Sequence, residues 1–378
     1  MIKAEARPEI RPLTGIRGFA AGLVLVTHFF PLWVKLVPSL QWLALLSGRG
    51  FLGVDLFFIL SGFILNYVYF DQAKSRLSFS EYRSFIWHRF VRIWPVHFAT
   101  IILLLALVLL AGCFSVTIAG NYSFAALPFQ LTMTHAWPFL PGSQNLDPYG
   151  AWTWNYPAWS ISAEWFAYLL VFPAMWYCLK YLNGRSGISF LLGYLLLGVW
   201  TMVVRPMNLN CCNMVCAVTF EFMTGALLYN VFRSSGKLTR SCQRLATPVF
   251  IVLVSGLLFC PANTPLFLAC VVLLFPVLLL GMTAETALIS KLFATPPALW
   301  LGRISYSIYM TQSITQRILK VVLVPEHYQQ SPLGLRLALL AGSLILILTV
   351  ASAVYYFVEN PSRAYLRNLA EGRAAQHE

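Results

Sequence analysis

Long apolar runs, separated by short polar segments, dominate the chain of 378 residues. A helix needs about 20 mostly apolar residues to cross the ~30 Å hydrocarbon core of a bilayer. Runs approaching that length cover residues 13–32, 50–69, 93–114, 160–181, 188–204, 214–232, 247–260, 265–283, 299–323 and 334–357. The pattern predicts an all-α, polytopic integral membrane helix bundle with about ten transmembrane helices.

The basic residues fall unevenly on the two sides of these predicted spans. When the N-terminus is placed in the cytoplasm, 19 of the 26 Lys and Arg residues lie on the cytoplasmic side, six lie outside, and Arg17 lies within the first span. An excess of Lys and Arg in cytoplasmic loops orients membrane proteins. We therefore expect both termini in the cytoplasm, with residues 1–12 as an N-terminal segment, residues 13–361 as one transmembrane domain and residues 362–378 as a C-terminal tail.

Composition narrows the classes of function. Hydrophobic residues make up 59% of the chain and charged residues 10%, which excludes a soluble enzyme, a disordered chain and a nucleic-acid-binding module. The net charge of +13 follows mainly from orientation, so the cytoplasmic face meets anionic lipid headgroups or an anionic cytosolic ligand. The eight Cys residues show no metal-binding spacing, and no metal is expected.

Ionisable residues inside a span cost roughly 3 kcal/mol each on insertion scales and are functional candidates by default, and four of them stand out. They are Arg17, His28, Asp55 and Glu164. Arg17 and His28 are eleven residues apart, close to a whole number of helical turns. Both therefore project from one face of the first span, about 16 Å apart along its axis.

His28, Asp55 and Glu164 fall at a similar depth, in the outer third of the bilayer, when counted from the ends of their spans. A carboxylate at that depth would orient the His28 imidazole and raise its basicity, so we interpret all three as catalytic candidates. The structural alternative is that His28 is a hydrogen-bonded packing residue and that the two acids cap their helices. The alignment with Arg17 favours the functional interpretation.

Further basic residues gather at the predicted cytoplasmic face. Arg89 and Arg92 precede the third span in the segment RFVRIWP, and Arg303 lies in LGRISYSIY. Guanidinium groups bind phosphate oxygens in a bidentate manner, so with Arg17 these residues predict a basic mouth for phosphate groups. Anchoring by the positive-inside rule explains Arg89 and Arg92 equally well, but it explains Arg17 and Arg303 less well because both lie within apolar sequence.

The longest segment between spans, roughly residues 115–159, falls outside and is rich in aromatic residues. Trp152, Trp154 and Trp159 offer flat faces that suit the C–H surfaces of sugars, and we regard them as candidate substrate-binding residues. An aromatic belt at the membrane interface explains them equally well.

Several motifs together resemble the membrane-bound acyltransferase-3 family. In order along the chain they are LTGIRGFAAGLVLVTHFF, GVDLFFILSGFIL, RFVRIWP, WSISAEWFAYLLVFP, LGRISYSIY and VENP. The resemblance runs from about Leu13 to Pro361, and the ordered set is far more specific than any single motif. It implies a bundle of the predicted size in the plasma (inner) membrane of a bacterium. We expect the stand-alone form of the family, without an attached soluble domain.

The resemblance also implies an activity. Members of the family transfer an acyl group, commonly acetyl, from cytosolic acyl-CoA to hydroxyls of extracytoplasmic glycans or related molecules. Acyl-CoA would be a co-substrate, and no permanently bound cofactor is expected. The essential pair of the family falls on Arg17 and His28. Other typical positions that this chain holds are Asp55, Arg89, Arg92, Glu164, Arg303, Ser305 and Tyr306.

Four positions depart from the pattern of that family. Thr14 stands where Asp is usual, and Trp165 replaces the second Glu of the WSxSxEE block. His97 takes a usual Tyr position, and Gln312 takes that of a common His. These departures weaken any role for residues 14 and 312 and leave the Arg17–His28 pair intact.

Two functions are compatible with these residues. In the first, Arg17 and Arg303 hold the phosphates of acyl-CoA, and His28 acts as general base on an acceptor hydroxyl or as an acyl relay. In the second, the chain is a proton-coupled transporter or flippase of a glycan or lipid-linked sugar, and the buried His and carboxyl groups form a proton relay. The spacing of Arg17 and His28 favours the enzyme.

Overall fold

The computed structural model describes residues 7–70, 77–115, 122–138, 153–182, 184–204, 211–261 and 264–375. The regular elements within this part of the chain are all helices, which confirms the all-α class. Those long and apolar enough to cross a membrane cover Arg11–Leu36, Leu52–Tyr69, Phe79–Cys113, Met214–Ser234, Gly236–Phe259 and Leu333–Leu369. The chain is therefore a multi-pass membrane protein.

The α-helices follow one another as α1 (Arg11–Leu36), α2 (Ala44–Ser47), α3 (Leu52–Tyr69), α4 (Phe79–Cys113), α5 (Leu127–Leu131), α6 (Ala158–Phe166), α7 (Phe172–Leu179), α8 (Gly184–Val204), α9 (Cys211–Ser234), α10 (Gly236–Phe259), α11 (Pro265–Gly281), α12 (Leu288–Phe293), α13 (Pro296–Val322), α14 (Leu333–Val354) and α15 (Asn360–Ala375). Short 3₁₀ turns cover Pro38–Leu43, Phe124–Ala126 and Pro325–Tyr328. Single π-helical turns cover Ala167–Val171 and Tyr355–Glu359.

Helix α4 begins at Phe79, well before the predicted start of the third span at residue 93. The reason is a capping box, in which the Glu81 N–H donates to the Ser78 hydroxyl at 3.2 Å and the Ser78 N–H donates to the Glu81 carboxylate at 2.8 Å. The RFVRIWP motif therefore lies inside a helix and not at its start. This continuous helix fixes the direction in which both arginines of the motif project.

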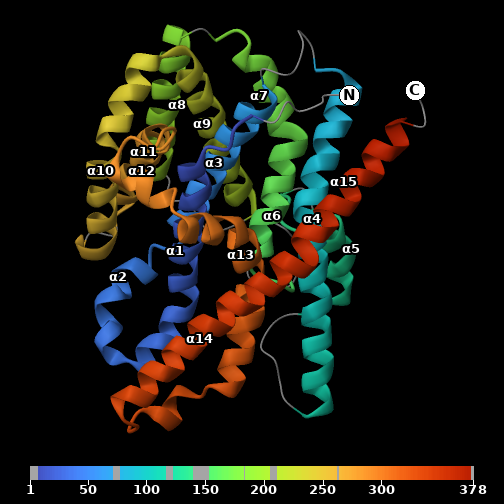
Figure 1. Cartoon of the computed structure of the whole chain (residues 1–378), viewed down its shortest axis with the longest axis vertical. Helices are drawn as coiled ribbons and strands as arrows, with labels where there is room; N and C mark the ends of the chain where they lie inside the picture. The colour runs from blue at the N-terminus through green and yellow to red at the C-terminus, as the bar shows by residue number, and fades with distance from the viewer. Residues whose placement is uncertain are drawn as a thin grey trace.

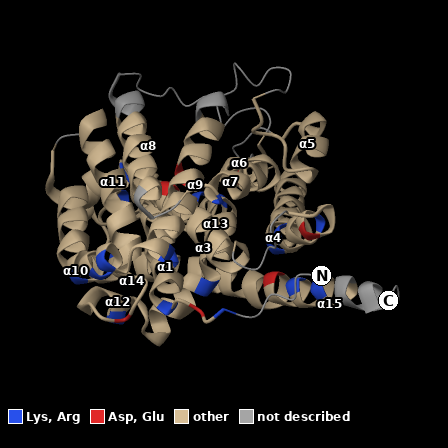
Figure 2. Ribbon diagram, turned by 90° about the horizontal axis from the view of Figure 1, so that it is seen from above, with Lys and Arg blue, Asp and Glu red and all other residues tan. Residues whose placement is uncertain are grey.

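The last predicted span continues beyond its expected end. A π-helical turn joins α14 to α15, and residues 362–375 of the predicted tail are helical. In Figure 1 the red α15 crosses the cyan upper part of α4, and the Trp87 indole N–H donates to the Leu366 carbonyl at 3.3 Å. Figure 2 shows a bundle with few charged residues and places basic residues along α15. The C-terminal helix is thus a packed part of the fold.

Helices α1 and α13 pack closely along much of their length. The contact depends on Gly302, because a Cβ atom at this position would overlap the carbonyl oxygen of Thr14 on α1. The close approach brings Arg17 of α1 and Arg303 of α13 to the same end of the helix pair. Small residues of this kind let membrane helices approach one another.

Replacing Gly302 by alanine is expected to destabilise the fold by about 1–3 kcal/mol, because α1 and α13 must move apart to admit the methyl group. The measurement is the melting temperature of the protein in detergent, followed by fluorescence-detected size exclusion. Gly22→Ala on α1 is the matched control, since nothing lies within 4 Å of a Cβ atom there. Equal melting temperatures of the two variants would contradict this account of the contact.

Candidate active site

A cavity of about 150 Å³ lies inside the bundle. Five of the predicted site residues line it together, although they come from four different helices and Tyr306 follows Glu164 by 142 positions in the chain: Arg17, Arg89, Arg92, Glu164 and Tyr306. Ser61, Ser160, Tyr168 and Tyr309 complete the polar part of the wall, and Phe57 and Phe58 supply apolar surface. We call this space the inner cavity.

Glu164 is held at the wall of the inner cavity by two hydroxyl groups. The Tyr168 hydroxyl donates a short hydrogen bond to it, and the Ser61 hydroxyl donates to the same carboxylate oxygen at 3.1 Å. Arg89 donates to the Tyr69 hydroxyl at 3.1 Å, and its charge lies close enough to interact with Glu164. The half-buried carboxylate is therefore both hydrogen-bonded and compensated by a cation, as removal of a charge from water requires.

A second cavity, of about 350 Å³, adjoins the first. Its wall holds two carboxylates, those of Glu9 and Glu359. It also holds five guanidinium groups, those of Arg17, Arg92, Arg303, Arg363 and Arg367. Arg17 and Arg92 belong to the walls of both cavities, so these two side chains mark the junction between them. We call the second space the basic cavity, and its chemistry suits a ligand with several negative charges.

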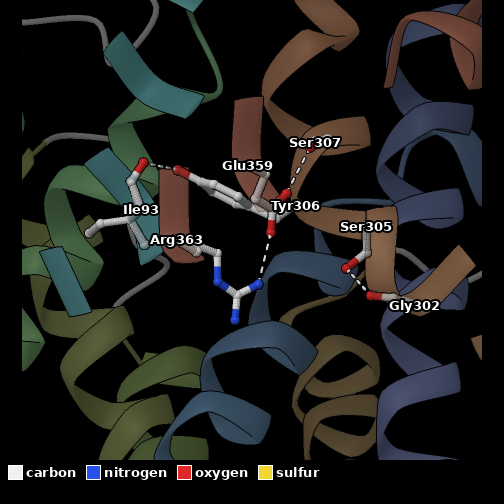
Figure 3. A network of polar contacts seen from close by, with 7 residues as sticks. All are labelled: Ile93, Gly302, Ser305, Tyr306, Ser307, Glu359 and Arg363. Carbon is white, nitrogen blue, oxygen red and sulfur yellow. Dashed lines mark hydrogen bonds and ion pairs between the residues drawn. The ribbon is translucent and has the colours of Figure 1, made fainter. Parts of the chain in front are cut away.

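The wall of the basic cavity is ordered by a network around Glu359, shown in Figure 3. Glu359 is only 2% exposed, accepts a hydrogen bond from the Ser307 hydroxyl at 2.8 Å, and pairs with Arg363 at 3.5 Å. The Tyr306 hydroxyl donates to the Ile93 carbonyl at 2.6 Å and joins α13 to α4. This network fixes α15 against the bundle and keeps the Arg363 guanidinium at the cavity.

Ser305 does not line either cavity in this structure. Its buried hydroxyl donates to the Gly302 carbonyl of its own helix at 2.8 Å, and Figure 3 shows both residues apart from the Glu359 network. The predicted cofactor-binding role of Ser305 is therefore corrected to a structural one. Arg303 stands at the edge of the basic cavity, where 55% of its side chain is exposed and Glu9 lies 3.8 Å away.

Sequence reasoning missed Arg363 and Arg367, because the segment that carries them was predicted to be a tail. Both lie on α15 and line the basic cavity. Their spacing of four residues places them on one face of a helix, and this spacing was the signal that could have found them. Tyr168 was also missed, although the same helical spacing could have found it, since its pairing with Glu164 is an (i, i+4) contact within the fourth predicted span.

His28 lies on α1, on the same uninterrupted helix as Arg17, as the spacing predicted. Its ring is half-buried and lies 4.7 Å from the Tyr156 ring, centroid to centroid. The Gln316 side chain of α13 donates a short hydrogen bond to the His28 backbone carbonyl. His28 lines neither cavity, and the hydrogen bonds of the described residues leave both nitrogens of its imidazole available.

The predicted pairing of His28 with Asp55 or Glu164 is wrong for this structure. Glu164 lines the inner cavity with Arg17, and the Asp55 side chain shares a hydrogen bond with Glu221 of α9, which requires a proton on one of the two acids. The depth count failed because it placed the start of the fourth span at the membrane surface. Asn155, just before α6, is already fully buried, so α6 starts deep in the bundle.

The three tryptophans of the outer segment have different positions. Trp152 lies outside the described residues. Trp154 is 1% exposed, and its indole N–H donates to the Ser123 carbonyl at 2.9 Å. Its ring packs edge-on against Tyr122 and Phe124, and because it is buried no face is open for a sugar, so its predicted substrate role is corrected to packing. Trp159 is half-buried against the main core.

Comparison with known proteins places this arrangement in a family. The family described as an acyltransferase domain (acyltransferase 3) matches residues 11–355, which include every residue of the inner cavity. The chain belongs to the acyltransferase-3 family. No solved structure shows significant similarity to the chain.

Two curated relatives of this acyltransferase-3 protein carry informative names. Peptidoglycan O-acetyltransferase OatA of Listeria monocytogenes is 23% identical over 330 residues, which is 81% of this chain and 49% of the relative. Acyltransferase MdmB of Streptomyces mycarofaciens is 32% identical over 166 residues, which is 44% of this chain and 38% of the relative. The chain therefore matches about half the length of the first relative and less of the second.

Three of the positions where this acyltransferase-3 protein departs from the family's pattern have clear structural settings. Thr14 lines the basic cavity, and its hydroxyl donates to Glu9 at 2.7 Å. His97 is buried, with its Nε2 atom 2.8 Å from the Gln130 carbonyl. Gln312 is fully buried on α13. The departures at residues 97 and 312 thus lie in the packed interior and away from both cavities.

Proposed function

We propose that this protein is a membrane O-acyltransferase that moves an acyl group, most often acetyl, from cytosolic acyl-CoA to a hydroxyl of an extracytoplasmic glycan. The observation that carries the proposal is the junction at Arg17 and Arg92, where a cavity rich in arginines meets a smaller, more apolar cavity inside the bundle. Membership of the acyltransferase-3 family and the similarity to the peptidoglycan O-acetyltransferase OatA support it.

The two cavities suit the two halves of a coenzyme A thioester. The phosphates would bind the guanidinium groups of the basic cavity, which provide the planar, bidentate donors that phosphate oxygens prefer. The neutral arm that carries the thioester would extend past Arg17 into the inner cavity, where Phe57, Tyr306 and Tyr309 offer apolar and aromatic surface. The volume of the inner cavity fits part of such an arm and not the whole coenzyme.

The transfer step is assigned to His28. Its imidazole would take the proton of the acceptor hydroxyl while the hydroxyl oxygen forms a bond to the thioester carbonyl carbon. The carbon–sulfur bond then breaks, and coenzyme A leaves as the thiol after receiving that proton. An acyl relay through His28 uses the same residue as nucleophile. Arg17 and His28 lie about 16 Å apart along α1, so the long arm of the donor would bridge them.

The proposed function is tested with the purified protein reconstituted into liposomes that contain an N-acetylglucosamine oligosaccharide. Acetyl-CoA labelled with deuterium is added outside. An O-acyltransferase is expected to release one free thiol for each labelled ester, which mass spectrometry detects on the oligosaccharide. Accumulation of unmodified sugar that follows a proton gradient, with no thiol released, would support the transporter instead and refute the enzyme.

Removing an arginine of α15 is expected to weaken binding of acetyl-CoA. For Arg363→Ala and for Arg367→Ala we expect a rise in Kd of roughly 10-fold, since hydrogen bonds to charged groups contribute about 1.5–3 kcal/mol. Isothermal titration of the protein in nanodiscs measures the effect. Arg240→Ala on α10, an exposed arginine outside both cavities, is the matched control. If all three variants bind acetyl-CoA like the parent protein, α15 does not contribute to the donor site.

A further inference from the structure

The wall of the basic cavity contains three side chains that phosphate binding does not explain. They are Glu9, Tyr355 and Asn360, and they line the cavity together with its arginines. A carboxylate repels phosphate, and a phenol ring or a neutral amide adds little to the binding of phosphate beside so many guanidinium groups. The other carboxylate of the wall, Glu359, is already used in the network of Figure 3. The three side chains therefore indicate that the ligand has an uncharged, polar part next to its phosphates.

A π-helical turn at Tyr355–Glu359 brings Tyr355 and Asn360 to the same cavity. In a regular α-helix, residues five apart point about 140° away from each other, so these two side chains would face different directions. Here the Asn360 N–H donates to the Tyr355 carbonyl, which widens the turn by one residue. Single π-helical turns frequently occur at functional sites. This turn places a flat ring and an amide beside the phosphate-binding arginines.

Glu9 is held in place on the short segment that precedes α1. One of its carboxylate oxygens accepts a hydrogen bond from the Thr14 hydroxyl at 2.7 Å, and the other lies 3.8 Å from the Arg303 guanidinium. The adjoining Pro8 carbonyl accepts a hydrogen bond from the Tyr67 hydroxyl at 3.1 Å. A carboxylate has about four lone-pair positions, so Glu9 can accept a further hydrogen bond from a ligand in the cavity.

We propose that Glu9, Tyr355 and Asn360 form a subsite that recognises the adenine base of the acyl-CoA donor. This inference rests on the proposed function and adds the residues that select the nucleotide part of the donor. The adenine ring would lie on the Tyr355 ring, since aromatic side chains stack on bases. The Asn360 amide would bond both the 6-amino group and N7, a pairing by which asparagine reads adenine in nucleic acids. Glu9 would accept the second N–H of that amino group.

The subsite selects the base by its hydrogen-bond donors. In hypoxanthine a carbonyl oxygen replaces the 6-amino group, so the Glu9 carboxylate would face an acceptor and Asn360 would lose an N–H partner. A site built to bond an N–H group rejects an analogue that lacks it. A site that bound only the phosphates and the flat face of the base would hold both donors equally well, because they share these features.

The test compares acetyl-CoA with its analogue that carries hypoxanthine in place of adenine. Isothermal titration of the parent protein in nanodiscs measures both donors. We expect Kd for the hypoxanthine donor to be at least ~10-fold higher, because polar groups of the subsite lose their partners. Equal Kd values for the two donors would overturn the proposal.

Two variants locate the preference. Asn360→Ala is expected to raise Kd for acetyl-CoA ~10-fold and Kd for the hypoxanthine donor much less, since only adenine forms the paired contact. Glu9→Gln removes a negative charge that acts alike on the phosphates of both donors, so the ratio of the two Kd values isolates the contact with the base. That ratio should fall to ~3-fold or less, because a glutamine amide can donate to the hypoxanthine oxygen.

Glu285→Gln is the matched control. Glu285 pairs with Arg11 at 3.6 Å and lies outside both cavities, so this variant also removes an exposed carboxylate and should keep the parent ratio. A parent-like ratio in both Asn360→Ala and Glu9→Gln would overturn the proposal.

The transfer assay separates this hypothesis from the proposed function. If the parent protein forms the labelled ester and releases thiol but binds both donors alike, only the adenine subsite fails. If the parent protein prefers the adenine donor but forms neither ester nor thiol, the transferase function fails and the selection of the base stands.

Discussion

Replacing His28 by alanine is expected to lower the rate of acyl transfer by about 10²–10⁴-fold, the usual contribution of a positioned general base. His28 lies outside both cavities, so Kd for acetyl-CoA should stay unchanged. The measurement pairs a single-turnover assay of labelled ester with isothermal titration of acetyl-CoA. Loss of transfer with full donor binding would separate the chemical step from donor binding.

The matched control for this prediction is His88→Ala. His88 lies on α4, and its Nδ1 atom is 2.7 Å from the Ser84 carbonyl, so it has a local structural partner. The control should transfer at the parent rate. Transfer by His28→Ala at more than a tenth of the parent rate would remove His28 from the chemical step, whether as base or as relay.

Replacing Arg17 by alanine is expected to raise Kd for acetyl-CoA by roughly 10–150-fold, from the ~1.5–3 kcal/mol that hydrogen bonds to charged groups contribute. The effect should exceed that of either α15 arginine, because Arg17 lines both cavities and its charge interacts with Glu359 and Glu164. Arg17→Lys should bind with intermediate affinity, since an ammonium group cannot form the bidentate contact. Isothermal titration in nanodiscs measures all three proteins.

Arg11→Ala tests whether the effect of Arg17 is specific. Arg11 begins the same helix, pairs with Glu285 at 3.6 Å, and lies outside both cavities. Its substitution should leave Kd for acetyl-CoA within about two-fold, as is usual for an exposed ion pair. If Arg11→Ala and Arg17→Ala weaken binding equally, the loss reflects the position of α1 and not a contact with the donor.

The sequence contained the information for the membrane class and for much of the donor site. Apolar run length predicted the helices, because the bilayer imposes a minimum length on each span. Arg17 was recognisable because a charge in an apolar run is rare enough to draw attention, and Arg89 and Arg92 were grouped with it by their position at the predicted cytoplasmic face. The structure brings these three residues to one cavity, although they lie on two helices separated by α3.

Other parts of the site depend on packing that no local pattern encodes. Glu164 was placed beside His28 by counting from the membrane surface, but the buried segment before α6 shifts the helix inward. Asp55 was assigned to His28 without knowledge of Glu221, whose position on α9 follows only from how α3 and α9 meet. Arg363 was interpreted as part of a tail because the apolar run ends before it, whereas the helix continues through a π-helical turn that has no simple sequence signal.

The junction of the two cavities also bears on the electrical insulation of the membrane. A protein that passes an acyl group from one side of a bilayer to the other opens a route that protons and metal cations would follow down their gradients. Fixed guanidinium groups at a constriction repel such ions. Because Arg17 and Arg92 line both cavities, the same charges that would attract an anionic donor would also repel cations where the two cavities meet, and so help to preserve the membrane potential.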